Sequence, residues 1–411
     1  MRQSCPAPAS RLRTDLRAVL FFVVLCTSAA AAESAAAPLT AAALGREIFL
    51  DPSLSASGRM ACATCHDPAH AHAQSNAAAV QSGGANLDVP GLRSVPSLRY
   101  LDSGAFLFDK DGTPTGGFNR DGRAASLLDQ AERPFLAAHE MANGDAATVA
   151  AKLAAAGYAD DFRKVFGEDA FDDAESALLR ARFAIAAYEK SAPELHPFDS
   201  KYDYFLNGKV SLVPAELRGF ALFNRKDKGN CAACHTSTRG SDGAPPLFTD
   251  FSYDNLGVPR NAQIPANADP AYFDLGLCGP DRIDLVTRRD LCGAFKVPTL
   301  RNVATRQVFF HNGLFKTLRD AVRFYVRRDT HPEEFYPRTA DGTLLKFDDL
   351  ARDLQRNVNI KEVPYDRRPA QAPRLDEAEV DDLVAFLHTL TDGYDAATDT
   401  ADPARNVPAA L

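Results

Sequence analysis

The sequence has no tryptophan among its 411 residues and only three methionines, Met1, Met60 and Met141. The first absence excludes any electron relay through an indole side chain. The second has a local consequence, because no methionine follows residue 141. Any metal site built from the later part of the chain must therefore take its ligands from residue types other than methionine.

The chain also lacks an apolar segment long enough to cross a membrane. The apolar run at residues 18–26 is far shorter than the ~20 residues that a spanning helix needs, and no later run is longer. Four arginines precede this run, and alanines at residues 30–32 follow it. This pattern is typical of a secretory signal peptide over residues 1–32. We therefore expect an exported mature protein with no membrane anchor.

Positive charge is scarce as well. The chain has 46 Lys and Arg against 54 Asp and Glu, which gives a net formal charge of −8 at pH 7. Loss of residues 1–32 removes four arginines and Asp15 and moves this charge to about −11. Such a charge argues against nucleic acid or an anionic membrane as a partner. It is compatible with a small electron-donor protein with a basic face, such as a cytochrome c or a cupredoxin.

Sustained β-type alternation is absent too, which disfavours a fold built on a large sheet. Capping residues and apolar spacing instead predict helices, and Gly- and Pro-rich stretches predict long loops between them. The predicted helices cover residues 40–50, 126–131, 145–156, 174–190, 198–206, 318–327 and 376–390, and a further helix opens at Pro214. The predicted fold class is mainly α.

Two C-x-x-C-H motifs organise this helical chain, one at residues 62–66 and one at residues 231–235. The two thiols of such a motif lie on one side of a helical turn, where both can form thioethers to one porphyrin. The histidine that follows then supplies the proximal nitrogen to the iron. The sequence therefore predicts two covalently attached haems c, held by Cys62, Cys65 and His66 and by Cys231, Cys234 and His235.

Other interpretations of these cysteines are weaker. Paired zinc knuckles usually lie ~15–20 residues apart, whereas these motifs lie 169 residues apart. A thioredoxin-like dithiol needs no adjacent histidine and expects a βαβ pattern. Bacteria attach haem c on the far side of the inner membrane, so the motifs agree with the signal peptide and predict a periplasmic protein.

Each motif follows a helix that contains a glycine and a phenylalanine, so the chain is interpreted as two cytochrome-c-like haem domains with long loops. The N-terminal domain is placed at residues 33–206, with a linker at 207–213. The C-terminal domain is placed at residues 214–394, and a tail follows at 395–411. Cys278 and Cys292 are the cysteines left over. In an oxidising compartment such a pair is typical of a disulfide, and the alternative is two buried thiols.

The ligand opposite the proximal histidine decides what each iron can do. Methionine is the usual partner in electron-transfer cytochromes c, but Met60 is too close to Cys62 to reach over the distal face. The second domain contains no methionine at all. The second iron must therefore use another residue, and the candidates are His311, His331, His388 or a tyrosine.

Several short segments accompany the two motifs. They are Asp121–Ala124, Gln130, Pro134, Glu140–Met141, Val297–Asn302, Phe310–Gly313, Thr317–Leu318 and Ala321–Val322. Together with the motifs they span roughly residues 44–391. In composition and order they resemble the bacterial diheme cytochrome c peroxidase and MauG family.

The resemblance implies that Tyr325, fourteen positions after His311, caps the second haem. Ordinary members of the family have methionine there, and MauG has tyrosine. Taken alone, Tyr325 shares a helical face with Leu318 and Val322 and would be interpreted as a packing residue. A phenolate stabilises ferric and ferryl iron, so a His/Tyr haem suits the storage of oxidising equivalents.

The resemblance also implies that peroxide reacts at the first haem. Glu140 would move a proton between the two peroxide oxygens, and Gln130 would form a hydrogen bond to the bound ligand. Without the resemblance these residues would be interpreted as an exposed charge and a surface amide. His70 and His72 could cap the first iron in the resting state, although histidines in a short polar loop are more typically solvated.

The chain departs from the family pattern at two places. Arg120 stands where members usually carry tryptophan, so electron transfer between the haems would use Phe118, a nearby tyrosine or direct tunnelling. The family also binds calcium between its domains, through an Asn side chain and two backbone carbonyls. These positions correspond to Ser94, Arg306 and Val308, and a serine is a poorer calcium ligand than an amide oxygen. The resemblance leaves the calcium ion open.

These features favour an exported diheme peroxidase that reduces hydrogen peroxide at the N-terminal haem. The His/Tyr haem would share the oxidising equivalents, up to a state with two ferryl irons. One alternative is a MauG-like oxidase that modifies an unknown partner protein, which the tyrosine favours and the lack of tryptophan disfavours. Another is a non-catalytic diheme electron carrier, which a six-coordinate first haem would favour.

Overall fold

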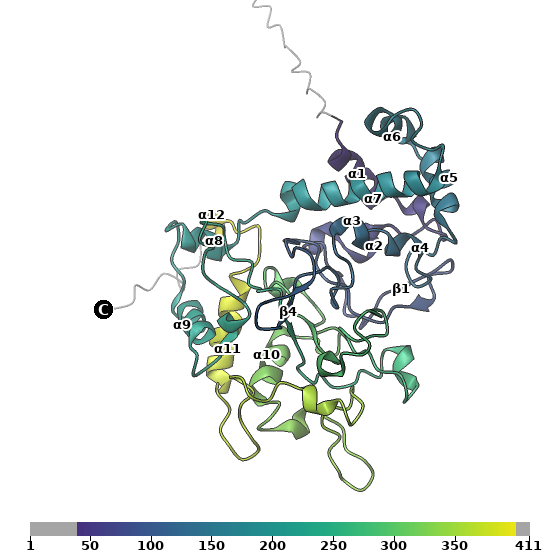
Figure 1. Cartoon of the computed structure of the whole chain (residues 1–411). Helices are drawn as coiled ribbons and strands as arrows, with labels where there is room; N and C mark the ends of the chain where they lie inside the picture. Colours follow the sequence, from purple (N-terminus) through teal and green to yellow (C-terminus); the bar gives the residue numbers. More distant parts are fainter. Residues whose placement is uncertain (1–38, 400–411) are drawn as a thin grey trace, which may run out of the picture. The chain divides into compact units, whose positions relative to one another are not determined.

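A computed structural model describes residues 39–399 (Figure 1). The predicted signal peptide and residues 400–411 of the predicted tail lie outside the described residues. Within the described range, no helix combines the length and the apolar character needed to cross a membrane. Residues 39 onward form one compact unit.

Helices are the main secondary structure, which confirms the predicted fold class. They are α1 Ala41–Leu50, α2 Cys62–Cys65, α3 Leu127–Gln130, α4 Arg133–Leu136, α5 Ala146–Ala155, α6 Ala159–Phe166, α7 Ala174–Ser191, α8 Lys201–Leu206, α9 Pro214–Asn224, α10 Leu318–Arg327, α11 Glu377–His388 and α12 Ala396–Asp399. The strands are short and pair antiparallel, β1 Ser82–Gly83 with β2 Val89–Pro90, β3 Leu107–Phe108 with β4 Pro114–Thr115, and β5 Tyr253–Asp254 with β6 Phe295–Lys296. Long loops connect these elements.

Capping side chains set most helix starts where the sequence predicts them. The Thr40 hydroxyl accepts a hydrogen bond from the Ala43 amide at 3.1 Å at the start of α1. The prediction of a helix from residue 198 is wrong, because α8 begins at Lys201. Ser200 and Asp203 form a reciprocal cap there, with the Ser200 amide donating to Asp203 Oδ2 at 3.0 Å. The short helices α4, α6 and α12 were not predicted.

Two hydrophobic cores are separate in sequence. The first involves α1, α5, α6 and α7 and draws its buried residues from positions 44 to 185. The second involves α8, α9, α10 and α11 and draws them from positions 202 to 390. Tyr202 of α8 already belongs to the second core, so α8 packs with the helices that follow it. The proposed linker at residues 207–213 stays a prediction.

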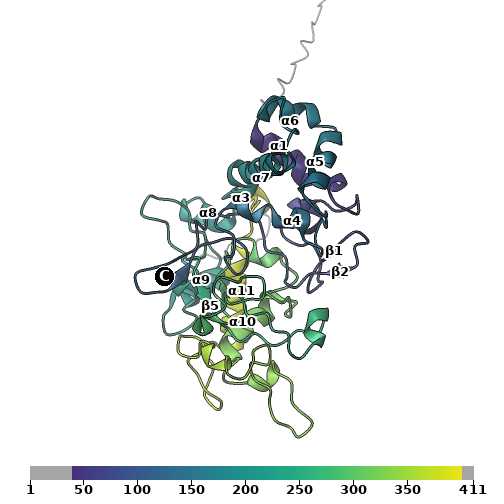
Figure 2. The same cartoon turned by 45° about the vertical axis from the view of Figure 1, so that its right-hand side comes forward.

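In each core, the helix that precedes a C-x-x-C-H motif crosses a second helix at a glycine. A Cβ atom added to Gly45 of α1 would lie 1.9 Å from the Ala184 carbonyl oxygen of α7. A Cβ atom added to Gly219 of α9 would lie 2.0 Å from the Asp382 carbonyl oxygen of α11. Figure 1 and Figure 2 show both helix pairs side by side. The two motifs therefore follow equivalent close helix crossings.

Charged groups anchor the loop at residues 93–123 to later parts of the chain. Arg93 Nε and Nη2 donate to the two oxygens of Asp274 at 2.6 and 2.7 Å, and Arg93 Nη1 donates to Asp121 at 2.7 Å. The Tyr100 hydroxyl donates to Asp392 at 2.6 Å. The Asp121 side chain is fully buried, so its charge depends on these partners. This loop leads into α3, which carries Gln130.

Gly219→Ala should lower the free energy of unfolding by about 1–3 kcal/mol, because the added methyl group overpacks the crossing of α9 with α11. Helix propensity alone would favour alanine by about 1 kcal/mol. The measurement is chemical denaturation of the haem-loaded protein. Gly157→Ala is the matched control, because a Cβ atom there meets nothing within 4 Å. Equal stability of the two variants would contradict the role of the crossing.

Candidate haem sites

The first C-x-x-C-H motif forms a helical turn that ends at its histidine. The His66 amide donates to the Cys62 carbonyl at 2.9 Å and closes the turn. The His66 ring donates from Nδ1 to the Pro96 carbonyl at 3.1 Å, which leaves Nε2 free for a metal. Burial lowers the pKa of His66 to about 4, so the ring is neutral at pH 7, as a ligand must be.

The second motif repeats this arrangement. The His235 amide donates to the Cys231 carbonyl at 2.8 Å, and His235 Nδ1 donates to the Phe248 carbonyl at 2.8 Å. Burial lowers the pKa of His235 as well. None of the four motif cysteines takes part in a disulfide, so each remains available for a thioether to haem. The residues at both motifs therefore fit the attachment of a haem c with a histidine ligand.

An internal cavity of about 300 Å³ lies beside the second motif. Cys231, Cys234 and His235 lie on its wall together with side chains of α10 and α11. Most of the helix side chains that line it are apolar, among them Leu318, Val322, Leu383 and Leu387. An apolar cavity beside a ligand histidine is the environment that a porphyrin requires.

Tyr325 lines this cavity from α10. Its ring centroid lies 5.7 Å from that of Phe310 and 6.2 Å from that of Tyr365. Among the described residues, none forms a hydrogen bond with the Tyr325 hydroxyl. Burial raises the pKa of this hydroxyl, and the negative charge of Asp254 raises it further. The phenol is therefore neutral in the protein alone and lines the same cavity as the motif cysteines.

The other candidate ligands are less well placed. His331 and His388 do not line the cavity. His311 does, but its ring stacks on Phe295 with centroids 3.8 Å apart, and its Nε2 lies 3.8 Å from Asp349. Met60 and Met141 are both buried in the first core. Tyr325 lines the cavity together with the residues of the second motif, and its role as a ligand stays a prediction.

Gln130 lies where the internal cavity adjoins a solvent-open hollow of about 710 Å³. Asn119 also lines both spaces. The hollow is bordered by charged side chains, and His139 also lines it. Its charged residues are Arg123, Asp129, Glu132, Arg133, Asp281, Arg282 and Asp284. A small polar molecule therefore has an open approach to Gln130.

Glu140 follows His139 and lies at the same edge of the structure. Its carboxylate is 3.5 Å from His139 Nε2, and its side chain is 34% exposed. Burial raises the pKa of Glu140, while the charges of His139, Arg133 and Arg123 oppose this rise. The negative charge of Glu140 also contributes to raising the pKa of Cys65. The structure thus brings Glu140 near both the first motif and the charged residues of the hollow.

The two histidines after the first motif differ from each other. His70 is partly exposed and bonds to Asp67 at 2.8 Å, in agreement with a solvated loop residue. His72 is only 1% exposed, so the expectation of solvation is wrong for it. Its backbone adopts a positive φ of 52°, and its carbonyl lies 3.4 Å from His66 Nδ1, on the proximal side. This position also argues against His72 as a distal ligand.

The groups considered for calcium are already engaged by two arginines. Arg120 Nη2 donates to Ser94 Oγ at 2.7 Å, and Arg306 Nε donates to the Val308 carbonyl at 3.2 Å. The Ser94 hydroxyl itself donates to the Phe310 carbonyl at 2.7 Å. Calcium needs six to eight oxygen ligands, and two guanidinium cations repel it. The residues at this place do not fit the calcium ion.

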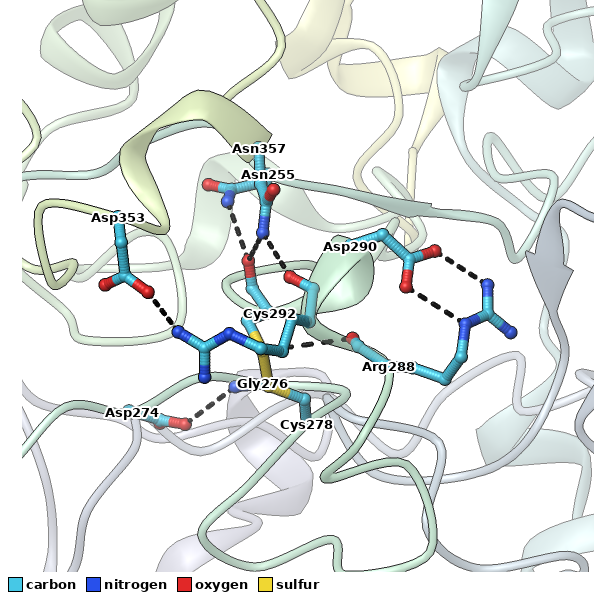
Figure 3. The surroundings of a disulfide bond; sticks show 10 residues. Asn255, Asp274, Gly276, Cys278, Arg288, Asp290, Cys292, Asp353 and Asn357 are labelled. Atoms are coloured by element: carbon cyan, nitrogen blue, oxygen red, sulfur yellow. Dashed lines mark hydrogen bonds and ion pairs between the residues drawn. A yellow bond between two sulfur atoms is a disulfide. The ribbon is translucent and has the colours of Figure 1, made fainter.

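Cys278 and Cys292 form a disulfide, as predicted, with Cα atoms 5.0 Å apart. Figure 3 shows that Asn255 and Asn357 both donate to the Cys292 carbonyl, each at 3.1 Å. The disulfide closes the loop that carries Asp281. Asp281 Oδ1 accepts from Arg133 Nη2 at 2.7 Å at the rim of the hollow. The disulfide therefore fixes one wall of the approach to Gln130.

Several residues of the cavity were not identified from the sequence. Tyr365 and Asp254 line it, and the Tyr365 hydroxyl donates to Asp254 Oδ2 at 3.2 Å. Burial raises the pKa of Asp254. Phe118, considered for electron transfer, also lines the cavity and is 7% exposed. Asp254 ends strand β5 and Tyr365 lies on a loop far from it in the sequence, and no local pattern marks them.

The sequence profile of the family described as di-haem cytochrome c peroxidase matches residues 40–211. The methylamine utilization protein MauG of Paracoccus denitrificans is 37% identical over 358 residues, which cover 85% of this chain and 88% of that protein. The cytochrome c551 peroxidase of Nitrosomonas europaea is 29% identical over 306 residues, which cover 71% of this chain and 76% of that protein.

A solved structure is similar over the same range. The diheme peroxidase BthA from Burkholderia thailandensis superposes with a TM-score of 0.79 at 40% identity. The similarity covers 86% of this chain and 86% of that chain. The similar proteins thus include both a MauG and two peroxidases.

Replacing Cys278 and Cys292 together by alanine should lower the free energy of unfolding by about 3 kcal/mol, because the disulfide no longer constrains the unfolded chain. The loop that carries Asp281 should also become more exposed, and hydrogen exchange of residues 279–291 should speed up. Denaturation and hydrogen–deuterium exchange of the haem-loaded variant measure both effects. Unchanged exchange in this loop would show that Arg133 and its neighbours hold the loop without the disulfide.

Proposed function

The chain belongs to the di-haem cytochrome c peroxidase and MauG family, and from this premise we propose that it reduces hydrogen peroxide at the haem held by His66. It is an oxidoreductase with two c-type haems. The observation that carries the proposal is the inequality of the two sites. Gln130 and Asn119 of the first half line a solvent-open hollow, whereas Tyr325 lines a cavity together with Cys231, Cys234 and His235.

The chain's own groups can serve the proton steps of peroxide reduction. When bound, the haem of the first motif would supply the iron that coordinates peroxide and donates electrons to it. The Glu140 carboxylate takes the proton from the inner peroxide oxygen and gives it to the outer one, so that water leaves rather than hydroxide. The Gln130 carboxamide holds the bound oxygen by a hydrogen bond. Two electrons and two further protons complete the conversion of hydrogen peroxide to two waters.

The second site is proposed to hold the His235 and Tyr325 ligands. Tyr325 loses its hydroxyl proton when it binds iron, and a phenolate ligand favours the oxidised metal. With these two ligands, the second haem would supply a site where oxidising equivalents could be stored until a donor delivers electrons. The proposed donor is a small cytochrome c or cupredoxin, whose basic face the chain's net charge of −8 would attract.

Export to the periplasm is part of the proposal. Covalent haem attachment at two C-x-x-C-H motifs and the Cys278–Cys292 disulfide both suit an oxidising compartment outside the cytoplasm. The proposed signal peptide over residues 1–32 would direct the chain there.

A second candidate function is the oxidation of a partner protein. It is favoured by the 37% identity to MauG and by the position of Tyr325. It is disfavoured because the chain has no tryptophan to carry an electron hole to its surface. Steady-state consumption of peroxide with a reduced cytochrome c separates the two functions. Rapid turnover supports the peroxidase, and reaction with peroxide that stops after one turnover without a protein substrate supports the alternative.

Glu140→Gln should slow the reaction of the diferric protein with peroxide by about 10²-fold or more, because the proton shuttle is lost. Burial raises the pKa of Glu140, and only its carboxylate form accepts a proton. The wild-type rate should therefore rise with pH through a pKa above the usual value for glutamate, and the variant should lose this dependence. Stopped-flow spectroscopy measures both.

Glu132→Gln is the matched control for this prediction. Glu132 lines the hollow beside which His139 and Glu140 lie, pairs with Arg182 at 2.5 Å, and its side chain is 46% exposed. Its loss should leave the rate and its pH dependence unchanged. If Glu140→Gln reacts as fast as Glu132→Gln, Glu140 has no role in proton transfer.

Tyr325→Phe should convert the second haem from low-spin to high-spin, because phenylalanine provides no oxygen ligand. The ferric wild-type protein should show one high-spin and one low-spin haem by electron paramagnetic resonance. Tyr365→Phe, from the same cavity, should keep the low-spin signal. A low-spin signal that survives in Tyr325→Phe would exclude the tyrosine ligand. If the wild type instead shows two low-spin haems and neither binds cyanide, the protein is an electron carrier.

A further inference from the structure

Arg120 and Arg306 are the feature from which this inference starts. Both side chains line the internal cavity, and neither forms an ion pair with any carboxylate in the described part of the chain. Other buried arginines of the protein do have such partners: Arg93 binds Asp274, and Arg301 binds Asp203 at 2.8 Å. The positive charges of Arg120 and Arg306 are therefore not neutralised by a carboxylate of the described residues, and a different partner must account for them.

The hydrogen bonds of the two arginines hold them in place from one side only. Arg120 Nε donates to the Ser94 carbonyl at 2.9 Å, and its Nη2 donates to Ser94 Oγ. Arg306 Nη2 donates to the Val95 carbonyl at 2.9 Å, and its Nε donates to Val308. In the described residues, no acceptor bonds to Nη1 of either arginine. Each guanidinium is thus fixed by backbone and serine oxygens and keeps donors directed away from them.

The electrostatics agree with this arrangement. Burial and, to a smaller extent, the positive charges of Arg306 and Arg93 together lower the pKa of Arg120 to about 9, while Asp274 opposes them. Burial lowers the pKa of Arg306 to about 10. Both groups remain cationic at pH 7. Two like charges near each other in a buried place are stable only when an anion faces them.

We propose that Arg120 and Arg306 take the place of the calcium ion between the haem sites and bind the propionate carboxylates of the haems. A guanidinium binds a carboxylate through two parallel hydrogen bonds, and free Nη1 donors are what such a contact needs. Ser94 and Val308, which would have to coordinate calcium, serve instead to orient the arginines. The haem-loaded protein accordingly binds no calcium.

The first experiment measures metals in the haem-loaded wild-type protein. The protein is dialysed against excess CaCl₂, desalted, and analysed for calcium and iron by plasma mass spectrometry. We expect two irons and fewer than about 0.1 calcium per chain, far from the retention of a high-affinity calcium site. We also expect the melting temperature and the optical spectrum to be unchanged by EGTA. One retained calcium for every two irons, or a spectral change on chelation, would overturn the proposal.

The second experiment tests the contact with the haem carboxylates through the midpoint potentials. Arg306→Gln and Arg120→Gln should each lower the potential of at least one haem, because removal of a nearby positive charge favours the ferric state. Arg306→Lys should restore most of the potential, since it keeps the charge. Arg288→Gln is the control, because Arg288 pairs with Asp290 at the surface. Potentials of the Gln variants equal to those of the control would overturn the propionate contact.

The outcome does not depend on peroxidase activity. Calcium content, potentials and spectra are measured without turnover. The proposal that the two arginines replace calcium can therefore fail while the peroxidase proposal holds, and the peroxidase proposal can fail while the arginine proposal holds. If a Gln variant does not retain haem, the metal analysis of the wild type still decides whether calcium is present.

Discussion

The close approach of α1 to α7 and of α9 to α11 depends on Gly45 and Gly219, where any other residue would place a carbon within 2.0 Å of a backbone oxygen. Of these four helices, α1 and α9 each lead into a C-x-x-C-H motif. The crossing therefore fixes the position from which the motif starts. The histidine of each motif then donates from Nδ1 to a backbone carbonyl, His66 to Pro96 and His235 to Phe248. Because the two crossings hold the motifs, the long stretches between them need no regular secondary structure.

The two sites share their proximal half and differ in their distal half. His66 and His235 each donate from Nδ1 to a carbonyl and are neutral because of burial. The distal side of the first site is built from short helices and a loop that Arg93 ties to Asp121 and Asp274. The distal side of the second is built from α10, a helix packed in the second core.

Features that depend on neighbouring residues could be predicted from the sequence. The motifs, most helix starts and the Cys278–Cys292 pair are of this kind, because spacing and capping chemistry act within a few residues. Tyr325 needed two further arguments, the lack of methionine in the second half and a resemblance to a known family. Features that depend on distant contacts could not be predicted. The burial of His72 results from a left-handed turn and the packing of Phe49 and Tyr188 around its ring.

The same limit applies to the wall of the hollow and to the arginines of the cavity. Asp281 meets Arg133 only because a disulfide-closed loop returns to the first half of the chain. Arg120 and Arg306 converge on Ser94, Val95 and Val308 from separate loops. Comparison with the family, position by position, shows that Ser94 stands where the family has asparagine. It does not show that the guanidinium groups of Arg120 and Arg306 lie next to Ser94.

The uncompensated charges of Arg120 and Arg306 link the maturation of this protein to its stability. Before haem is attached, the folded chain would enclose two cations with no anion to face them, and that state is disfavoured relative to an open one. Attachment of the anionic porphyrins would remove this electrostatic cost and so stabilise the closed form. A ligand that binds only the native state has the same effect on its stability. If Arg120 and Arg306 bind the haem propionates as proposed, the compact form would be more stable after both prosthetic groups have been inserted.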